Sequence, residues 1–152
     1  MRHLALLFLL FLAACSGDKA PVPAKAHATA TSTTTVGGAT LQTSTVALAD
    51  LNDAVAARYG IDRTREGIML LVTVRDPAGN GIHPGDLQLT ATVSVLPDPP
   101  KPLELRAIQT DGLTDYLGVV QAKAPATIAL KLNAVRGGSR ADMATTAELQ
   151  PR

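Results

Sequence analysis

Apolar and polar residues alternate along several short stretches of the chain. The clearest stretch is residues 87–95, where five apolar residues are separated by polar ones. A period of two, with one apolar and one polar face, is typical of a half-buried β-strand. Comparable stretches bounded by Gly, Pro, Asn or Asp are residues 41–46, 67–75, 103–108, 114–121, 128–133 and 143–149. The pattern therefore predicts about seven short strands.

One stretch has helical spacing instead. Leu51, Val55 and Tyr59 recur four residues apart and would share one face of a helix. Asp50 is the expected N-cap, and Gly60 can adopt the left-handed conformation that ends a helix. The pattern predicts one short helix near the start of the domain, packed against an edge or end of a sheet.

These elements favour one fold class. Turn signals recur about every 8–12 residues, and no long helix separates the strands, which argues against a parallel α/β sheet. The sequence therefore predicts an all-β fold: an immunoglobulin-like antiparallel β-sandwich of about seven strands with one short N-terminal helix. This domain is expected to span residues 39–152.

The chain begins with the features of a secretory signal. Arg2 and His3 precede the apolar run Leu4–Leu12, which is too short to cross a bilayer core that needs roughly 20 residues. The segment Leu12-Ala13-Ala14-Cys15 follows and holds the only cysteine of the chain. It resembles the lipobox of bacterial lipoproteins, which implies that residues 1–14 are a signal peptide and that Cys15 is lipidated. The alternative is an ordinary cleaved signal with an unrelated cysteine.

Residues 15–38 are rich in Ala, Thr, Pro, Lys and Ser and have no apolar periodicity. Such a segment cannot offset its ordering entropy by burial. We therefore expect a lipidated flexible tether. Ser16, rather than an aspartate, follows Cys15, and in lipoproteins this implies an outer-membrane location, here with the domain facing the periplasm.

Composition narrows the function classes. The formal net charge of the 152 residues is +1, so there is no basic footprint for nucleic acid, and no nucleic-acid partner is expected. The single cysteine excludes an internal disulfide framework, a cysteine-based zinc site and an iron–sulfur cluster. Both phenylalanines lie within residues 1–15, which leaves Tyr59 and Tyr116 as the aromatic residues of the expected mature chain.

Candidate chemistry is sparse. His83 is the one histidine of the predicted sandwich, and no nucleophile-elbow motif accompanies it, so no catalytic residue and no enzymatic activity are expected. Met69, Met143 and His83 are residue types that bind copper, but their spacing matches no copper motif. We therefore expect neither a metal site nor a cofactor.

The segment between the helix and the next strand is the candidate binding site. Tyr59, Arg63 and Arg65 lie close together there and could bind a carboxylate, a phosphate or a partner protein. The alternative is a packed tyrosine with solvated arginines that pair with Asp62 and Glu66.

The same segment carries a family resemblance. Residues 55–64 read Val55-Ala56-Ala57-Arg58-Tyr59-Gly60-Ile61-Asp62-Arg63-Thr64, and an apolar strand follows. This resembles DUF4426, a family of small proteobacterial envelope proteins in which Val-Ala-x-x-Tyr-Gly-Ile-x-Arg-Ser/Thr precedes a hydrophobic strand. The resemblance covers about residues 45–149. It implies a fold and a compartment but no mechanism, because the family has no assigned activity.

Two functions remain open. The first is a lipid-anchored periplasmic binding or interaction module, held at the membrane through Cys15 and bound to an envelope protein through a strand edge or the region around Arg63. The second is a carrier of a small ligand or metal that uses a pocket at the end of the sandwich.

Overall fold

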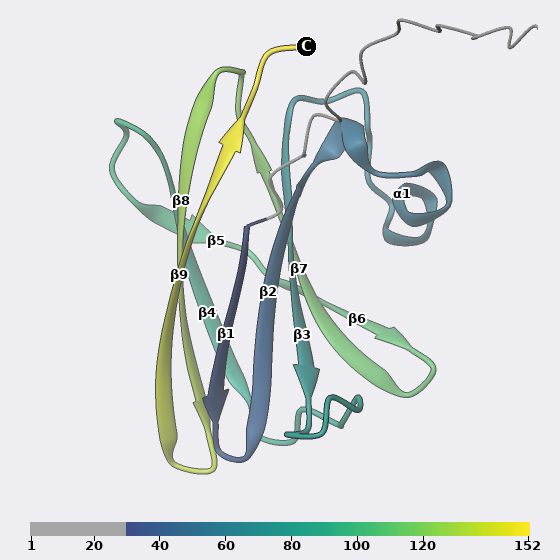
Figure 1. The fold of residues 1–152 in the computed structure, drawn as a ribbon, viewed down its shortest axis with the longest axis vertical. Coiled ribbons are helices and arrows are strands. Elements are labelled where there is room, and N and C mark those ends of the chain that lie inside the picture. Colours follow the sequence, from purple (N-terminus) through teal and green to yellow (C-terminus); the bar gives the residue numbers. More distant parts are fainter. Residues whose placement is uncertain (1–29) are drawn as a thin grey trace, which may run out of the picture.

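The computed structural model of the protein describes residues 30–152 (Figure 1). The elements in chain order are β1 (Thr31–Val36), β2 (Ala39–Ala47), a 3-10 turn η1 (Leu48–Asp50), α1 (Asp53–Tyr59), β3 (Gly67–Arg75), β4 (Gln88–Val95), β5 (Lys101–Leu103), β6 (Arg106–Thr110), β7 (Leu113–Gln121), β8 (Ala126–Arg136) and β9 (Ser139–Leu149). Within this range, no helix combines the length and the apolar character needed to cross a membrane.

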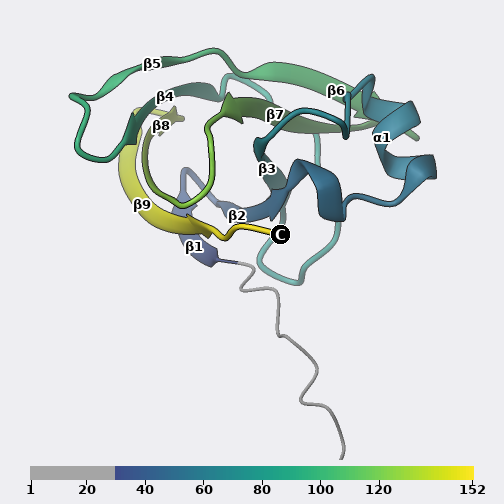
Figure 2. The ribbon, with the colours of Figure 1, turned by 90° about the horizontal axis from the view of Figure 1, so that it is seen from above.

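The strands form two antiparallel sheets. One has the order β1-β2-β3-β7-β6 and the other the order β5-β4-β8-β9. Seen from above, the sheets face each other, β1 lies beside β9, and the chain passes from one sheet to the other between β5 and β6 (Figure 2). The predicted all-β sandwich is confirmed. The described residues form nine strands rather than about seven, and the immunoglobulin-like classification stays a prediction.

The main core fills the space between the sheets. Leu41, Leu70, Val72, Ile128 and Leu130 are each at most 1% exposed, and all belong to one apolar cluster. Because successive side chains of a strand point to opposite faces, the alternating residues of β4 place Ala91 and Val93 in this core and Thr90 and Thr92 outside it.

A second apolar cluster lies on the outer face of the five-stranded sheet. Leu48, Leu51 and Ala56, from η1 and α1 and the segment between them, pack against Met69 of β3 and Leu117 of β7. The first part of β3 is therefore buried on both faces, between the main core and the helix, which explains why residues 68–72 are apolar without alternation.

The expected tether is too long at its C-terminal end. Residues 31–36 form β1, and the glycines at 37 and 38, both at positive φ, make the turn into β2. The error arose because β1 has little apolar periodicity. β1 is a threonine-rich edge strand, and β-branched threonines favour the extended backbone, while the Thr43 hydroxyl bonds the backbone of Ser32. Residues 15–29 of the expected tether lie outside the described residues.

The predicted strand at residues 103–108 is two strands. β5 pairs with β4 in one sheet, and β6 pairs with β7 in the other. Leu103 and Leu105 both pack against the main core, so the alternation continues across Glu104 although the chain changes sheets there. Alternation reports which face is buried, but it cannot report which sheet supplies the neighbour.

The helix begins later than predicted. Its N-cap is Asn52, whose side-chain oxygen accepts the N–H of Val55 at 2.8 Å. Asp50 instead ends η1 and forms an ion pair with Arg152. The predicted C-terminal glycine is confirmed, because Gly60 has φ 65° and ψ 39° and its N–H bonds to helix carbonyls.

Candidate functional site

A surface groove of about 520 Å³ lies on the outer side of the five-stranded sheet, next to α1. Its floor is β7, one wall is the loop that follows α1, and the other wall is the β5–β6 crossover. The lining residues are Leu48, Gly60, Ile61, Asp62, Arg65, Glu104, Arg106, Leu117, Val119 and Gln121.

The groove exists because the helix covers only part of β7. Leu117 belongs to the second apolar cluster, beneath the helix, and is 3% exposed. Val119, two residues further along the same face, is 38% exposed. The partner strand also ends here, because the pairing of β6 with β7 stops at Arg106 opposite Leu117. β7 continues to Gln121 in its pairing with β3. Beyond Leu117, the floor therefore has neither a covering helix nor a second neighbouring strand, and it presents Val119 and Gln121 to the surface.

Charged side chains line both walls. Arg106 donates from Nη2 to the backbone carbonyl of Tyr59, which ties the crossover to the end of the helix. Arg65 Nε lies 3.5 Å from Asp62 Oδ2, and Glu104 also lines the groove. Two guanidinium groups and two carboxylates therefore surround an apolar floor. This arrangement suits a ligand with apolar and polar groups of its own, such as a segment of another protein.

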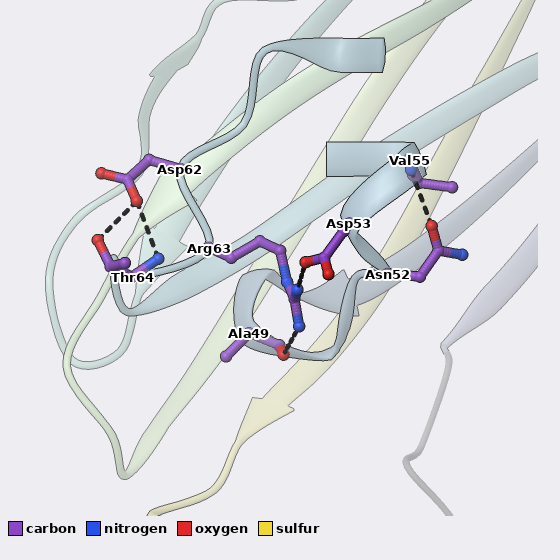
Figure 3. A network of polar contacts seen from close by, with 7 residues as sticks. All are labelled: Ala49, Asn52, Asp53, Val55, Asp62, Arg63 and Thr64. Atoms are coloured by element: carbon purple, nitrogen blue, oxygen red, sulfur yellow. Dashed lines mark hydrogen bonds and ion pairs between the residues drawn. The ribbon is translucent and has the colours of Figure 1, made fainter. Parts of the chain in front are cut away.

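Arg63 faces away from this groove. Its guanidinium bonds Asp53 through Nη1 and the carbonyl of Ala49 through Nη2, the latter at 3.2 Å (Figure 3). These contacts fasten the loop after α1 to the start of the helix and to η1. Tyr59 is half-buried and packs against the helix cluster. Of the three predicted binding residues, Arg65 alone lines the groove, and a binding role for the three stays a prediction.

Asp62 shapes the loop that forms one wall. Its Oδ1 accepts the backbone N–H of Thr64 at 2.9 Å and the Thr64 hydroxyl at 2.6 Å (Figure 3). These two hydrogen bonds, helped by the charge of Arg65, hold the pKa of the Asp62 carboxyl below its ordinary value. Because the folded-state pKa is depressed, the ionised Asp62 stabilises the folded loop at pH values above the unfolded-state pKa. This stabilisation is lost as the pH falls through the folded-state pKa.

Replacing Thr64 with valine is expected to raise the pKa of Asp62 towards its ordinary value, because the hydroxyl bond is the largest cause of the depression. The measurement is an NMR pH titration of the side-chain carboxyl carbons. Asp76, whose pKa is lowered by Asn80 in a separate turn, is the internal control and should titrate unchanged. An unshifted Asp62 in the variant would contradict the assignment of the cause.

The potential copper ligands are not brought together. Met69 belongs to the cluster beneath α1, whereas Met143 lies in the main core between the sheets, on the other side of the five-stranded sheet. His83 lies in the loop between β3 and β4, where its Nδ1 accepts the N–H of Gly85 at 3.0 Å. Among the described residues, His, Cys, Asp and Glu side chains nowhere form a group of three or more that could hold a metal ion. Cys15 lies outside the described residues.

The sequence pattern gave no indication that Glu104, Arg106 and Val119 line a groove. Residues 103–108 were interpreted as one strand, which hid the crossover that builds one wall. The proline-rich stretch before Leu103 was the available signal, since prolines are confined to edge strands and irregular segments. Val119 gave no signal, because an exposed valine and a buried one look the same in an apolar strand.

Comparisons with known proteins agree on the fold. A family model described as "Domain of unknown function (DUF4426)" matches residues 33–149. A DUF4426 family protein from Pseudomonas aeruginosa PAO1 is similar in structure, with a TM-score of 0.61 and 15% identity over 80% of this chain and 96% of that chain. No curated protein matches the chain in sequence.

Two structures of FetP from uropathogenic Escherichia coli strain F11 are also similar. The protein expressed recombinantly in the E. coli periplasm has a TM-score of 0.55 and 10% identity over 81% of this chain and 95% of that chain. A copper-bound variant of FetP has a TM-score of 0.55 and 8% identity over 80% of this chain and 95% of that chain. At these identities the likeness concerns the fold alone.

Proposed function

The chain belongs to the DUF4426 family, and from this premise we propose that it is a lipid-anchored binding module of the bacterial envelope without catalytic activity. Cys15 is the proposed lipid attachment site, and the outer membrane, with the domain in the periplasm, is the proposed location. The sandwich binds another envelope protein through the groove beside α1. The periplasmic expression of the structurally similar FetP is compatible with this compartment.

The exposed Val119 on the groove floor is the observation that carries the proposal. An apolar centre with a charged rim is the usual anatomy of a protein–protein interface. Here Val119 is the centre, while Arg65, Arg106, Asp62 and Glu104 form the rim. The rim charges balance, so partner choice depends on their positions more than on net charge.

The groove can be tested by site-specific photocrosslinking in living cells. A photoreactive amino acid at position 119 is expected to form a defined adduct with one envelope protein. The same amino acid at position 144 is the control, because Ala144 is exposed on the outer face of the other sheet. Val119→Asp should weaken capture of that partner about tenfold or more, because it places a charge at the centre of the contact.

Two results would contradict this site. Equal adducts from positions 119 and 144 would show that the crosslinks are nonspecific. Unchanged partner capture by Val119→Asp, with Ala144→Asp as the matched charge control, would show that the partner binds elsewhere.

The carrier alternative is supported by one observation, the fold shared with copper-bound FetP. It requires copper ligands that converge, whereas Met69 and Met143 lie in different apolar clusters. Calorimetric titration with copper distinguishes the two functions. One tightly bound copper ion per chain, lost on Met69→Leu or His83→Ala, would favour the carrier.

A further inference from the structure

The loop between β4 and β5 is an exposed apolar tip. Residues 96–102, here called the proline tip, are all exposed and comprise the loop residues Leu96, Pro97, Asp98, Pro99 and Pro100 and the first two residues of β5, Lys101 and Pro102. Leu96 is 52% exposed. Within residues 30–152, Leu96 and Val119 are the exposed large hydrophobic residues. Val119 lies in the groove, so Leu96 marks a second apolar surface.

The backbone of residues 96–100 has no unused N–H donor. The N–H of Leu96 donates to the carbonyl of Thr127 at 3.0 Å, and that of Asp98 donates to the carbonyl of Val95 at 2.9 Å. The other three residues are prolines and have no N–H. The carbonyl of Asp98 also accepts the Ser94 hydroxyl. Unsatisfied backbone donors are what normally keep irregular loops out of lipid, and this loop lacks that obstacle.

Strand register shows at which end of the sandwich the proline tip lies. Val95 pairs with Ile128 at the start of β8, and the loop before β8 joins it to the end of β7. The end of β7 pairs with the start of β3, which in turn pairs with the end of β2. β1 begins with Thr31 opposite Ser44, three residues before the end of β2, and runs away from this end of the sheet. The described chain therefore enters β1 from the side of the sandwich that carries the proline tip (Figure 1).

Cys15 lies 15 residues before Ala30. Even fully extended, this stretch of chain spans only about 50 Å. An anchor at Cys15 would therefore keep the domain within about this distance of the bilayer.

We propose that the proline tip is a second, noncovalent membrane contact, in which Leu96 and the prolines enter the headgroup region of the bilayer that holds Cys15. This inference rests on the proposed lipid anchor. The charges of Asp98 and Lys101 oppose each other, so the contact is apolar and shallow and does not depend on anionic lipid.

The chain contains no tryptophan, so Leu96→Trp adds a single fluorescent reporter of depth. The full chain is produced in bacteria, purified from membranes and reconstituted into phosphatidylcholine vesicles, with and without phosphatidylglycerol. If mass spectrometry finds the Cys15 thiol free, the protein is coupled to a maleimide lipid at that residue. Ala78→Trp is the control, because Ala78 is exposed in the turn after β3, at the opposite end of the sandwich.

The Leu96→Trp emission is expected to shift to shorter wavelength and to be quenched by brominated acyl chains in both vesicle types, even at high salt. The Ala78→Trp emission should not change. Equal behaviour of the two variants would overturn the membrane contact, and a signal that needs phosphatidylglycerol or vanishes with salt would overturn its apolar nature. The mass of the Cys15 peptide decides the anchor separately, so failure of one proposal is not mistaken for failure of the other.

Discussion

Replacing Arg136 with alanine is expected to lower the free energy of unfolding by about 2–4 kcal/mol, since a charge-assisted hydrogen bond contributes about 1.5–3 kcal/mol. Arg136 ends β8 and joins three segments that are distant in sequence. Its Nε donates to the carbonyl of Pro84 at 3.0 Å, and its Nη1 donates to the carbonyl of Gly37. Without it, both carbonyls lose their charged donor in a partly buried region.

Gly37 shows how closely these segments approach. Its φ is +50°, and a Cβ added there would lie 2.4 Å from the carbonyl oxygen of Arg136. The turn between β1 and β2 is therefore fitted against the end of β8, and the Arg136 side chain fixes it in place. Loss of this contact should loosen the β1 edge before the rest of the sandwich.

Urea denaturation of three variants tests this role. Arg140→Ala is the matched control, because Arg140 is exposed on β9, and such surface substitutions usually change stability by less than about 0.5 kcal/mol. The stability of Arg136→Lys should fall between those of the control and Arg136→Ala, because a single ammonium group cannot reproduce a planar guanidinium that donates to two carbonyls. If Arg136→Ala and Arg140→Ala unfold alike, the bridge does not contribute to stability.

Local pattern predicted the elements whose side chains and turns are fixed by near neighbours. β3 extends over residues 67–75, as predicted, because an unbroken apolar run suits a strand buried on both faces. The turn at Asp111 and Gly112 was also predictable, since both residues adopt positive φ, 51° and 78°, the conformation that a two-residue hairpin of this type requires.

Elements whose stability comes from distant contacts were not predictable in this way. β1 exposes most of its threonines and is held by its ladder with β2 and by the fit of the following turn against β8. Its composition alone does not distinguish it from a tether. The prolines before Leu103 indicated an edge or irregular segment, but the alternation of residues 103–108 gave no sign that the chain changes sheets at Glu104.

The candidate site was partly predictable for the same reason. Charge density in residues 58–66 pointed to a segment that lines one wall of the groove, but it could not show where each guanidinium points. Arg63 turns back to Asp53 at the start of the helix, whereas Arg65 lines the groove. The other half of the groove comes from residues 104–121, which only the fold brings to the helix.

Replacing Cys15 with serine is expected to remove the lipid and release the domain from membranes. Each buried CH₂ of a lipid chain contributes about 0.8 kcal/mol to the free energy of membrane binding. One myristoyl chain gives a membrane association constant of only about 10⁴ M⁻¹, so stable attachment needs more than one chain or a second contact. The native protein should therefore sediment with membranes until detergent is added. Its N-terminal peptide should begin at Cys15 and carry the mass of the lipid.

Two further variants make the outcome decisive. Replacement of residues 1–15 by an ordinary cleavable secretion signal should place the whole domain in the soluble periplasmic fraction, because neither lipid nor an uncut signal then remains. Leu96→Asp, with Cys15 intact, should stay on the membrane, since the proline tip supports the anchor but does not replace it. Membrane retention of the chain without Cys15, or an unmodified thiol at Cys15 in the native protein, would contradict lipid anchoring at Cys15, and the groove beside α1 and the proline tip would then be the surfaces to test.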